Sequence, residues 1–263
     1  MKIYSFYNEK GGVGKTTGTL CLLSYFKDNK KKKAIAIDMD PQRSMTLLSG
    51  AKPKPGCMIL DVLTDETNIR DAITTTAFGD IIATNRELNS IDTQMDVDSA
   101  ETVSQRKECE ENLLTLRKKL RELDGIYDYV IIDCPPGYAN ISMACMIASD
   151  SLILPAKASK ASLFALSSVV PMIAKARKYN PDLQIAGVLL NFHNDRTNAS
   201  RYGAEASAKL AEINLKTKVF NSTIRYSTAV EDSFFEGVPL FNKPSPVADD
   251  YKCFFEELLR GEK

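Results

Sequence analysis

Short runs of apolar residues alternate along this chain with longer stretches in which apolar residues recur every three or four positions. The short runs predict strands at Ile3–Tyr7, Ala34–Ile37, Asp80–Ala83, Tyr129–Ile132, Ser151–Leu154 and Ile185–Leu190. The longer stretches predict amphipathic helices over 15–28, 105–123, 162–179, 199–212 and 247–260. Strand–helix alternation with unbroken apolar strands is typical of an α/β fold: a mostly parallel, twisted sheet with helices on both faces.

The length and the loops favour a single domain over 1–263. A chain of 263 residues is long enough for one large α/β unit, and neither a repeat nor a low-complexity linker divides it. Pro171 lies inside the expected helix 162–179 and predicts that this helix is kinked or split there. In parallel sheets, ligands bind beyond the carboxyl ends of the strands, so the candidate chemistry is expected at that edge.

Composition excludes several classes of site. The single histidine, His193, rules out a histidine-based triad or a zinc site with several histidine ligands. Equal numbers of acidic and basic residues, 34 each, argue against a chain-wide nucleic-acid footprint but leave room for a local basic patch. The six cysteines form no C-x-x-C pair and are expected as buried free thiols. With no membrane-length apolar run and no signal-like start, we expect a cytoplasmic protein without a membrane partner.

Residues 10–17 read Lys-Gly-Gly-Val-Gly-Lys-Thr-Thr and follow the first strand-like run. A glycine-rich turn between a strand and a helix leaves backbone N–H groups unpaired, and with the positive helix end they cradle phosphate. In this chemistry Lys15 reaches the β- and γ-phosphates and the Thr16 hydroxyl ligates Mg²⁺. The alternative is a chance glycine- and lysine-rich surface turn. We predict nucleoside triphosphate binding through Gly11, Gly12, Val13, Gly14, Lys15, Thr16 and Thr17.

The loop departs from the ordinary phosphate-loop pattern G-x-x-x-x-G-K-[ST] in one position. Glu9 stands six residues before Lys15, where that pattern has glycine, and a second lysine, Lys10, follows it. The string K-G-G-x-G-K-T-T resembles the deviant Walker loop of the ParA/MinD group of ATPases. The resemblance implies ATP and Mg²⁺ as cofactors and slow ATP hydrolysis.

Two further acidic segments follow predicted strands. The second run ends in Asp38-Met39-Asp40-Pro41-Gln42, and the fourth ends in Ile132-Asp133-Cys134-Pro135-Pro136. An unpaired aspartate is costly to bury, and a hydrated Mg²⁺ held between Thr16 and Asp133 removes that cost. The alternative for Asp133 is a helix-capping or loop aspartate.

These two segments resemble the switch segments of ParA-type partition ATPases. The carboxyl-terminal third follows the same order, with Gly187–Leu189 leading to Asp195–Thr197, then Thr223–Ser227 and Gly237–Leu240. The resemblance covers most of the chain and is weak between about 50 and 110. Two departures, Arg43 in place of the usual glycine after D-P-Q and a longer segment Ala156–Leu163, lie near the expected dimer or partner face.

The resemblance also implies roles for individual residues. Lys10 would cross to the nucleotide of a second subunit in an ATP-bound homodimer, and the alternative is a solvated loop lysine. Asp40 would orient or activate the attacking water, so the catalytic set is Lys10, Lys15 and Asp40. Asp38 would lie near the Mg²⁺ shell with Thr16 and Asp133, and Asn191 is counted with the nucleotide-binding residues.

Sequence-independent DNA binding by that dimer would need cations that follow the phosphates. The best candidates are Arg225, Lys216, Lys218 and Lys243, although Arg225 also fits a surface salt bridge or a nucleotide-pocket residue. We therefore predict a DNA-partition switch, nucleoid-associated when it binds DNA, whose hydrolysis is stimulated by a ParB-like or other partner.

The main alternative is a MinD-like or cargo-positioning ATPase that acts on a membrane or a protein assembly. Its membrane form needs a basic amphipathic helix at the carboxyl end, whereas 249–260 carries four acids and two bases. A metallocentre ATPase would need a cluster-binding cysteine, and Cys134, directly after Asp133, is expected to be buried.

Overall fold

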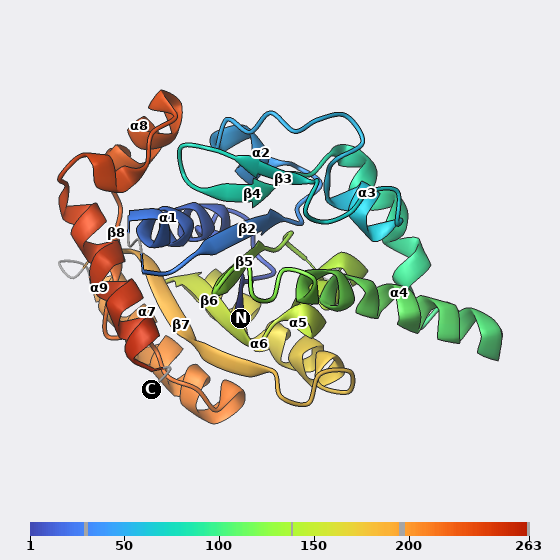
Figure 1. Ribbon diagram of the computed structural model, residues 1–263. Coiled ribbons are helices and arrows are strands. Elements are labelled where there is room, and N and C mark those ends of the chain that lie inside the picture. Colours follow the sequence, from blue (N-terminus) through green and yellow to red (C-terminus); the bar gives the residue numbers. More distant parts are fainter. Residues whose placement is uncertain (29–30, 138, 195–197, 262–263) are drawn as a thin grey trace.

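The computed structural model describes residues 1–28, 31–137, 139–194 and 198–261, and within them eight strands form one sheet (Figure 1). The strand order is β3-β4-β2-β5-β1-β6-β7-β8, and every neighbouring pair is parallel except β3–β4. The strands span β1 Lys2–Phe6, β2 Ala34–Asp38, β3 Ile73–Thr75, β4 Asp80–Ile82, β5 Tyr129–Asp133, β6 Ser151–Lys157, β7 Gln184–His193 and β8 Ile224–Arg225. The predicted mostly parallel sheet is confirmed.

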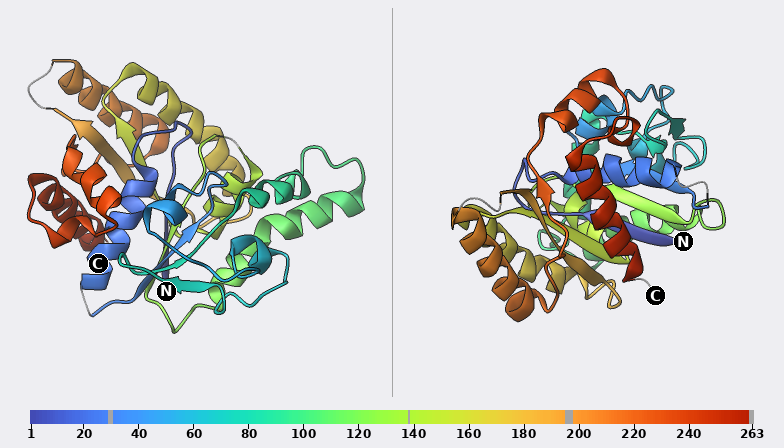
Figure 2. Two further views of the ribbon diagram at one scale, coloured as in Figure 1. Left: turned by 90° about the horizontal axis from the view of Figure 1, so that it is seen from above. Right: turned by 90° about the vertical axis from the view of Figure 1, so that its left-hand side faces the viewer.

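Helices cover both faces of this sheet. They span α1 Lys15–Asp28, α2 Ser44–Leu48, α3 Ile59–Leu63, α4 Val103–Arg121, α5 Asn140–Ala148, α6 Lys160–Ala176, α7 Asn198–Leu210, α8 Thr228–Glu236 and α9 Pro246–Arg260. Side chains from α1 and α9 belong to one buried apolar cluster, and those from α4, α5 and α6 belong to the other. Figure 2 shows the two layers from above and from the side, with the start of α4 extending away from the sheet.

Strand alternation explains why there are two clusters. In β5, Val130 and Ile132 face the cluster on one side, and Ile131 between them faces the other. Every residue of β5 is buried, as expected for a central strand of a parallel sheet. Because one sheet joins all these elements and helices pack on both of its faces, we propose that 1–263 is a single domain.

Pro171 neither ends nor divides α6, which runs continuously from Lys160 to Ala176, so a split helix is wrong. Leu166, Val169 and Ile173 of this helix are buried in the core, and their packing favours the helical path through the proline. Cys253 is exposed, so the expectation of buried thiols is wrong there, and Cys57 and Cys109 are only half-buried. The short helices α2, α3, α5 and α8 and the edge strands β3 and β8 were not anticipated from the sequence.

Candidate nucleotide site

The phosphate loop runs from the end of β1 to the start of α1 and depends on glycine at two positions. Gly12 and Gly14 have φ angles of 68° and 96°, in the left-handed region that disfavours other residues. A Cβ atom on Gly14 would lie 2.2 Å from Nδ2 of Asn191, whereas Gly11 and Gly12 have open space above them. The loop therefore keeps its backbone bare where a phosphate would approach.

Asn8, which the sequence analysis missed, holds this loop from below. Its side chain is fully buried; Oδ1 accepts the Lys10 N–H at 2.9 Å, and Nδ2 donates to the Pro155 carbonyl at 2.8 Å. Asn191 holds the loop from the end of β7, because Nδ2 donates to the Val13 carbonyl at 2.9 Å. The buried side-chain amides of Asn8, just after β1, and Asn191, in β7, thus fix the loop to the sheet.

The two loop lysines differ in their surroundings. Lys15 is 7% exposed, and its Nζ donates over long distances to the carbonyls of Asn8, 3.3 Å, and Lys10, 3.4 Å. Burial lowers the pKa of Lys15, and the nearby Asp133, Cys134 and Asp40 oppose that shift. The half-buried Lys10 side chain makes no ion pair or hydrogen bond with the residues that the structure describes. Both ammonium groups gain from an anionic ligand over the loop.

Asp133 ends β5 and lies in register with Asp38 at the end of β2. The Thr16 hydroxyl donates to Asp133 Oδ2 at 2.7 Å, while the buried Asp133 Oδ1 has no partner among the described residues. Burial and the adjacent Asp38 raise the pKa of Asp133 well above its ordinary value. A buried carboxylate oxygen without a partner, beside a threonine hydroxyl, fits a hard cation that takes oxygen ligands.

The oxygen atoms of Thr16 and Asp133 can be compared with the ligands that Mg²⁺ ordinarily takes. Within the described ranges, no group of three or more His, Cys, Asp or Glu side chains could hold a metal ion by itself. Mg²⁺ is ordinarily bound by one or two carboxylates together with phosphate oxygens and water. Thr16 and Asp133 at the foot of a phosphate cradle therefore fit Mg²⁺ that arrives with a nucleotide.

Asp38 is fully buried and is braced by its own segment. Oδ2 accepts the N–H and the hydroxyl of Thr46 at 2.8 and 2.7 Å, and Oδ1 accepts the Asp40 N–H at 3.1 Å. Burial raises the pKa of Asp38 to about 6, although these three hydrogen bonds oppose the shift. The side chain thus ties the end of β2 to α2 as well as lying beside Asp133.

Asp40 lies in the turn that follows β2 and is 8% exposed. Its Oδ1 accepts the Gln42 N–H at 2.9 Å. Burial raises its pKa, and the Gln42 hydrogen bond and the charge of Lys15 act in the opposite direction. The turn brings the carboxylate into the electrostatic environment of Lys15, where a phosphate would lie.

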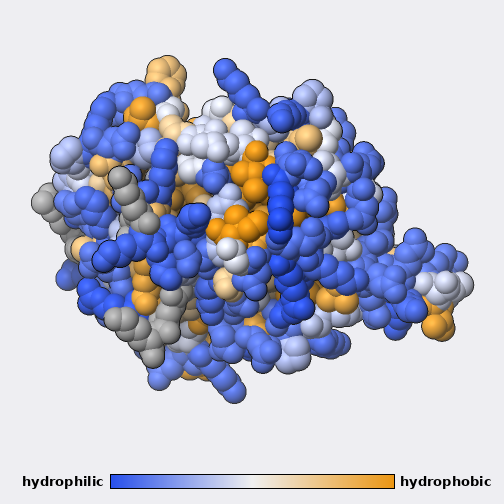
Figure 3. Space-filling model, in the orientation of Figure 1, coloured by the Kyte–Doolittle hydropathy of each residue, from blue (hydrophilic) through white to orange (hydrophobic). Residues whose placement is uncertain are grey.

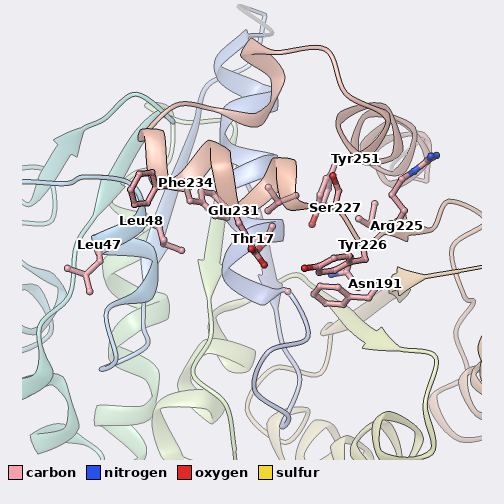
Figure 4. Close-up of a pocket in the computed structure, with 15 residues that line it drawn as sticks. Thr17, Leu47, Leu48, Asn191, Arg225, Tyr226, Ser227, Glu231, Phe234 and Tyr251 are labelled. Carbon is pink, nitrogen blue, oxygen red and sulfur yellow. The ribbon is translucent and has the colours of Figure 1, made fainter.

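A pocket of about 640 Å³ opens beside the start of α1 (Figure 4). Leu47, Leu48 and Phe234 line one side, Arg225, Tyr226 and Asn191 line the other, and Thr17 lies between them. Tyr251 of α9 closes the inner wall. Apart from Thr17, Asn191 and Arg225, none of these residues was expected here, because they come from segments that only the tertiary fold brings together.

The four candidate DNA-binding cations do not form one cluster. Arg225 makes a two-bond ion pair with Asp250, at 2.7 and 2.8 Å, at the carboxyl end of the sheet. Lys243 pairs with Glu236. Lys218 lies beside the beginnings of β1, β6 and β7, at the opposite edge, and the exposed Lys216 precedes it by two residues. The segment 195–197, which contributed to the family resemblance, lies outside the described residues.

Two surface features bear on the alternative membrane role. The apolar side chains Val247, Tyr251, Phe254, Phe255 and Leu258 of α9 are buried, as expected for core contacts. Hydrophilic side chains cover most of the face in Figure 3, and apolar ones gather near its middle. None of the helices in the described ranges has the length and apolar character to span a membrane.

Comparison with known proteins agrees with this geometry. Residues 1–185 match the AAA domain family. The sporulation initiation inhibitor protein Soj of Bacillus subtilis is 29% identical over 91% of this chain and 90% of its own length. The chromosome partitioning protein ParA of Myxococcus xanthus is 27% identical over 99% of this chain and 89% of its own length.

Solved structures share the fold along nearly the whole chain. An ATP complex of McdA from Cyanothece superposes with a TM-score of 0.80 at 24% identity, covering 98% of this chain and 96% of that one. The cell division ATPase MinD of Pyrococcus furiosus superposes with a TM-score of 0.73 at 22% identity, covering 98% of both chains. These neighbours confirm the P-loop NTPase architecture.

Proposed function

Because this chain belongs to the AAA domain family and is a ParA-type P-loop ATPase, we propose that it is an ATP-dependent dimerising switch for DNA partition. One observation carries the nucleotide part of this proposal: Thr16 donates to Asp133, whose second carboxylate oxygen is buried without a partner beneath the glycine loop. An Mg²⁺–ATP complex satisfies that oxygen and gives Lys15 its counter-charge.

Different groups of the loop would contact the phosphates and the Mg²⁺ ion. The backbone from Gly11 to Thr17 cradles the phosphates, and Lys15 neutralises their charge. Thr16 and Asp133 hold Mg²⁺, with Asp38 beside them. When bound, Mg²⁺ neutralises charge that develops on the phosphate oxygens. The pocket beside Thr17 and Asn191 is large enough for the ribose and the base.

Two residues are assigned to hydrolysis. Asp40 accepts a hydrogen bond from the attacking water and orients it, and its position beside Lys15 supports this role. Lys10 reaches the nucleotide of a second subunit, where a further ammonium stabilises charge on the departing phosphoryl group. Lys10 is half-buried, and its side chain has no hydrogen-bond or ion-pair partner in the part of the chain that the structure describes, which supports this assignment. Even with a raised pKa, a carboxylate is a weak base towards water, so turnover is slow, as suits a timed switch.

The cargo is assigned from the relatives. Soj and ParA relatives are named for chromosome partitioning, and by analogy the ATP-bound dimer of this chain binds DNA without sequence preference in the cytoplasm, on the nucleoid. A ParB-like protein stimulates hydrolysis and release. Arg225 and Lys243 pair with carboxylates within one subunit, and Lys218 lies at the opposite edge of the sheet, so we propose that Arg225, Lys216, Lys218 and Lys243 contribute to a shared DNA surface only when two subunits meet.

The test separates nucleotide chemistry from DNA binding. Lys15→Ala should abolish ATP binding in calorimetry, because the loop loses its phosphate counter-charge. Asp40→Ala, saturated with ATP, should bind duplex DNA with a log affinity that falls against log salt by about 0.9 per phosphate contacted. Retained ATP binding in Lys15→Ala contradicts the site.

Arg225→Gln tests the cation assignment and should weaken DNA binding equally for all sequences, reducing the salt slope by about one. We use glutamine because a glutamate there would face Asp250. The matched control is Arg106→Gln at the exposed start of α4, which should leave binding unchanged. A loss of ATP affinity in Arg225→Gln would place this arginine in the nucleotide pocket instead.

The second candidate is a MinD-like or cargo-positioning ATPase. Its membrane form lacks support, because the apolar face of α9 is buried in the core and the helix is acidic. Its protein-positioning form shares the fold with McdA. ATP-dependent DNA binding at low salt favours partition, and its absence in Asp40→Ala favours a protein assembly as cargo.

A further inference from the structure

Unpaired buried polar atoms concentrate at one edge of the sheet. Among the residues that the structure describes, Thr19 Oγ1, Arg43 Nε, Asn85 Oδ1 and Asp133 Oδ1 are buried without a hydrogen-bond partner. Asp133 is explained by the magnesium site, and Thr19 lies within α1. Arg43 and Asn85 follow the carboxyl ends of the paired strands β2 and β4, where the nucleotide site assigns neither of them a role. Such groups require an explanation because each costs free energy.

Arg43 is also strained. Its φ and ψ are 62° and 27°, in the left-handed region, and it directly precedes α2. Its N–H donates to the Asp40 carbonyl at 2.7 Å, so Arg43 closes the turn that carries Asp40. Glycine adopts this conformation without strain. A strained residue persists where its side chain has a use.

The unpaired donor and the unpaired acceptor lie on segments that are already joined. The Thr84 N–H donates to Thr46 Oγ1 at 3.1 Å and so ties α2 to the residues after β4. Arg43 is three residues before Thr46, and Asn85 directly follows Thr84. A buried donor and a buried acceptor, each without a partner among the described residues, therefore lie on segments that contact each other.

We propose that Arg43 is a positioning residue for ATP hydrolysis. When ATP holds the turn, Arg43 Nε–H donates to Asn85 Oδ1, and this bond fixes the turn that carries Asp40. Pairing two buried polar atoms that otherwise lack partners makes the ATP-bound arrangement more favourable. The inference rests on the proposed function, since ATP is the ligand that moves the turn.

Thermal unfolding with and without Mg²⁺ and a non-hydrolysable ATP analogue tests the pairing. Arg43→Ala, Asn85→Ala and the double variant should behave additively without nucleotide. With the analogue, each single variant should lose part of the thermal shift, and the double variant should lose no more than one of them. If the double variant instead loses as much of the thermal shift as the two single variants together, the pairing is overturned.

Turnover supplies the second readout. Arg43→Ala and Asn85→Ala should each weaken ATP binding and lower kcat by about tenfold, because a hydrogen bond to a charged group that forms only with ATP bound is lost. Asn85→Asp keeps an acceptor oxygen and should retain kcat within about threefold. A merely structural role would lower stability without nucleotide and leave kcat at saturating ATP unchanged.

Arg43→Gly is the decisive variant, because it relieves the strain and removes the guanidinium. Its melting temperature without nucleotide should rise by about 2–4 °C, while kcat falls as far as in Arg43→Ala. Parent-level kcat in Arg43→Gly would overturn the positioning role. If the melting temperature of the parent does not rise with the analogue, the proposed function fails and the pairing with it. If the parent's melting temperature rises and both alanine variants retain that rise in full, only the pairing is overturned.

Discussion

Ionisation of the buried Asp38 carboxyl is expected to lower the free energy of unfolding of the protein, and the size of this cost can be measured. Burial raises its pKa from an ordinary 3.8 to about 6. A difference of this size corresponds to about 3 kcal/mol, by which the folded site prefers the protonated over the ionised carboxyl. Asp38→Asn replaces the carboxylate by a neutral group of nearly the same shape, so it removes this penalty at neutral pH.

The sign of the pH dependence follows from proton binding. Between pH about 3.8 and about 6 the folded parent binds more protons at Asp38 than the unfolded chain does. The free energy of unfolding of the parent therefore falls through this window as pH rises, and the contribution is constant above it. Asp38→Asn lacks this titration, so its stability relative to the parent should rise with pH.

The magnitude combines this gain with lost hydrogen bonds. Asp38 accepts three hydrogen bonds from Thr46 and Asp40, and an amide keeps one acceptor oxygen, so about one or two bonds of roughly 1 kcal/mol each are lost. At about pH 7.5 the variant should therefore be about 1–2 kcal/mol more stable than the parent. At about pH 4.5 roughly 2 kcal/mol of that difference should have disappeared.

Urea unfolding at several pH values, without Mg²⁺ or nucleotide, measures the effect. Asp182→Asn removes one carboxylate at an exposed position and is the matched control. A stability difference for Asp38→Asn that does not change with pH would refute the assignment of the raised pKa to burial. The variant should also bind Mg²⁺–ATP more weakly, since a charge beside Asp133 is gone.

Four further outcomes are expected. Asp40→Ala should keep ATP bound but hydrolyse it about 10²–10⁴-fold more slowly, and parent-rate hydrolysis would disprove its role. In light scattering this variant should be a dimer with ATP, and adding Lys10→Ala should weaken the dimer or its residual turnover; no change in either would exclude a cross-subunit contact. Asn191→Asp, which removes the donor to the Val13 carbonyl, should weaken ATP binding about tenfold or more in calorimetry, and parent affinity would show that this bond does not hold the loop. Burial acts to raise the pKa of Glu257, but hydrogen bonds from the loop before β8 outweigh burial and lower this pKa. Glu257→Gln should therefore lose its full stability contribution at neutral pH and progressively less as pH falls below about 4.5. A stability loss that is equal at all pH values would argue against the lowered pKa.

The sequence predicted what depends on local pattern. Apolar runs gave six of the strands, because a buried parallel strand needs continuous apolar residues, and the string at 10–17 predicted the loop, because a bare turn needs glycine at Gly12 and Gly14. It missed the two edge strands, β3 of three residues and β8 of two, which have too few apolar residues to form a pattern. It misjudged Pro171, where packing of the helix against the core outweighed the local preference.

What only the tertiary structure decided is which distant groups meet. Val13 meets Asn191 across 178 positions, and Thr16 meets Asp133 across 117, because parallel strands place their carboxyl ends at one edge. The wall of the pocket beside Thr17 and the pairing of Arg225 with Asp250 depend likewise on where α8 and α9 pack. The sequence by itself therefore determined the kind of ligand through local backbone needs, and long-range packing determined the charge and burial of each group that would act on it.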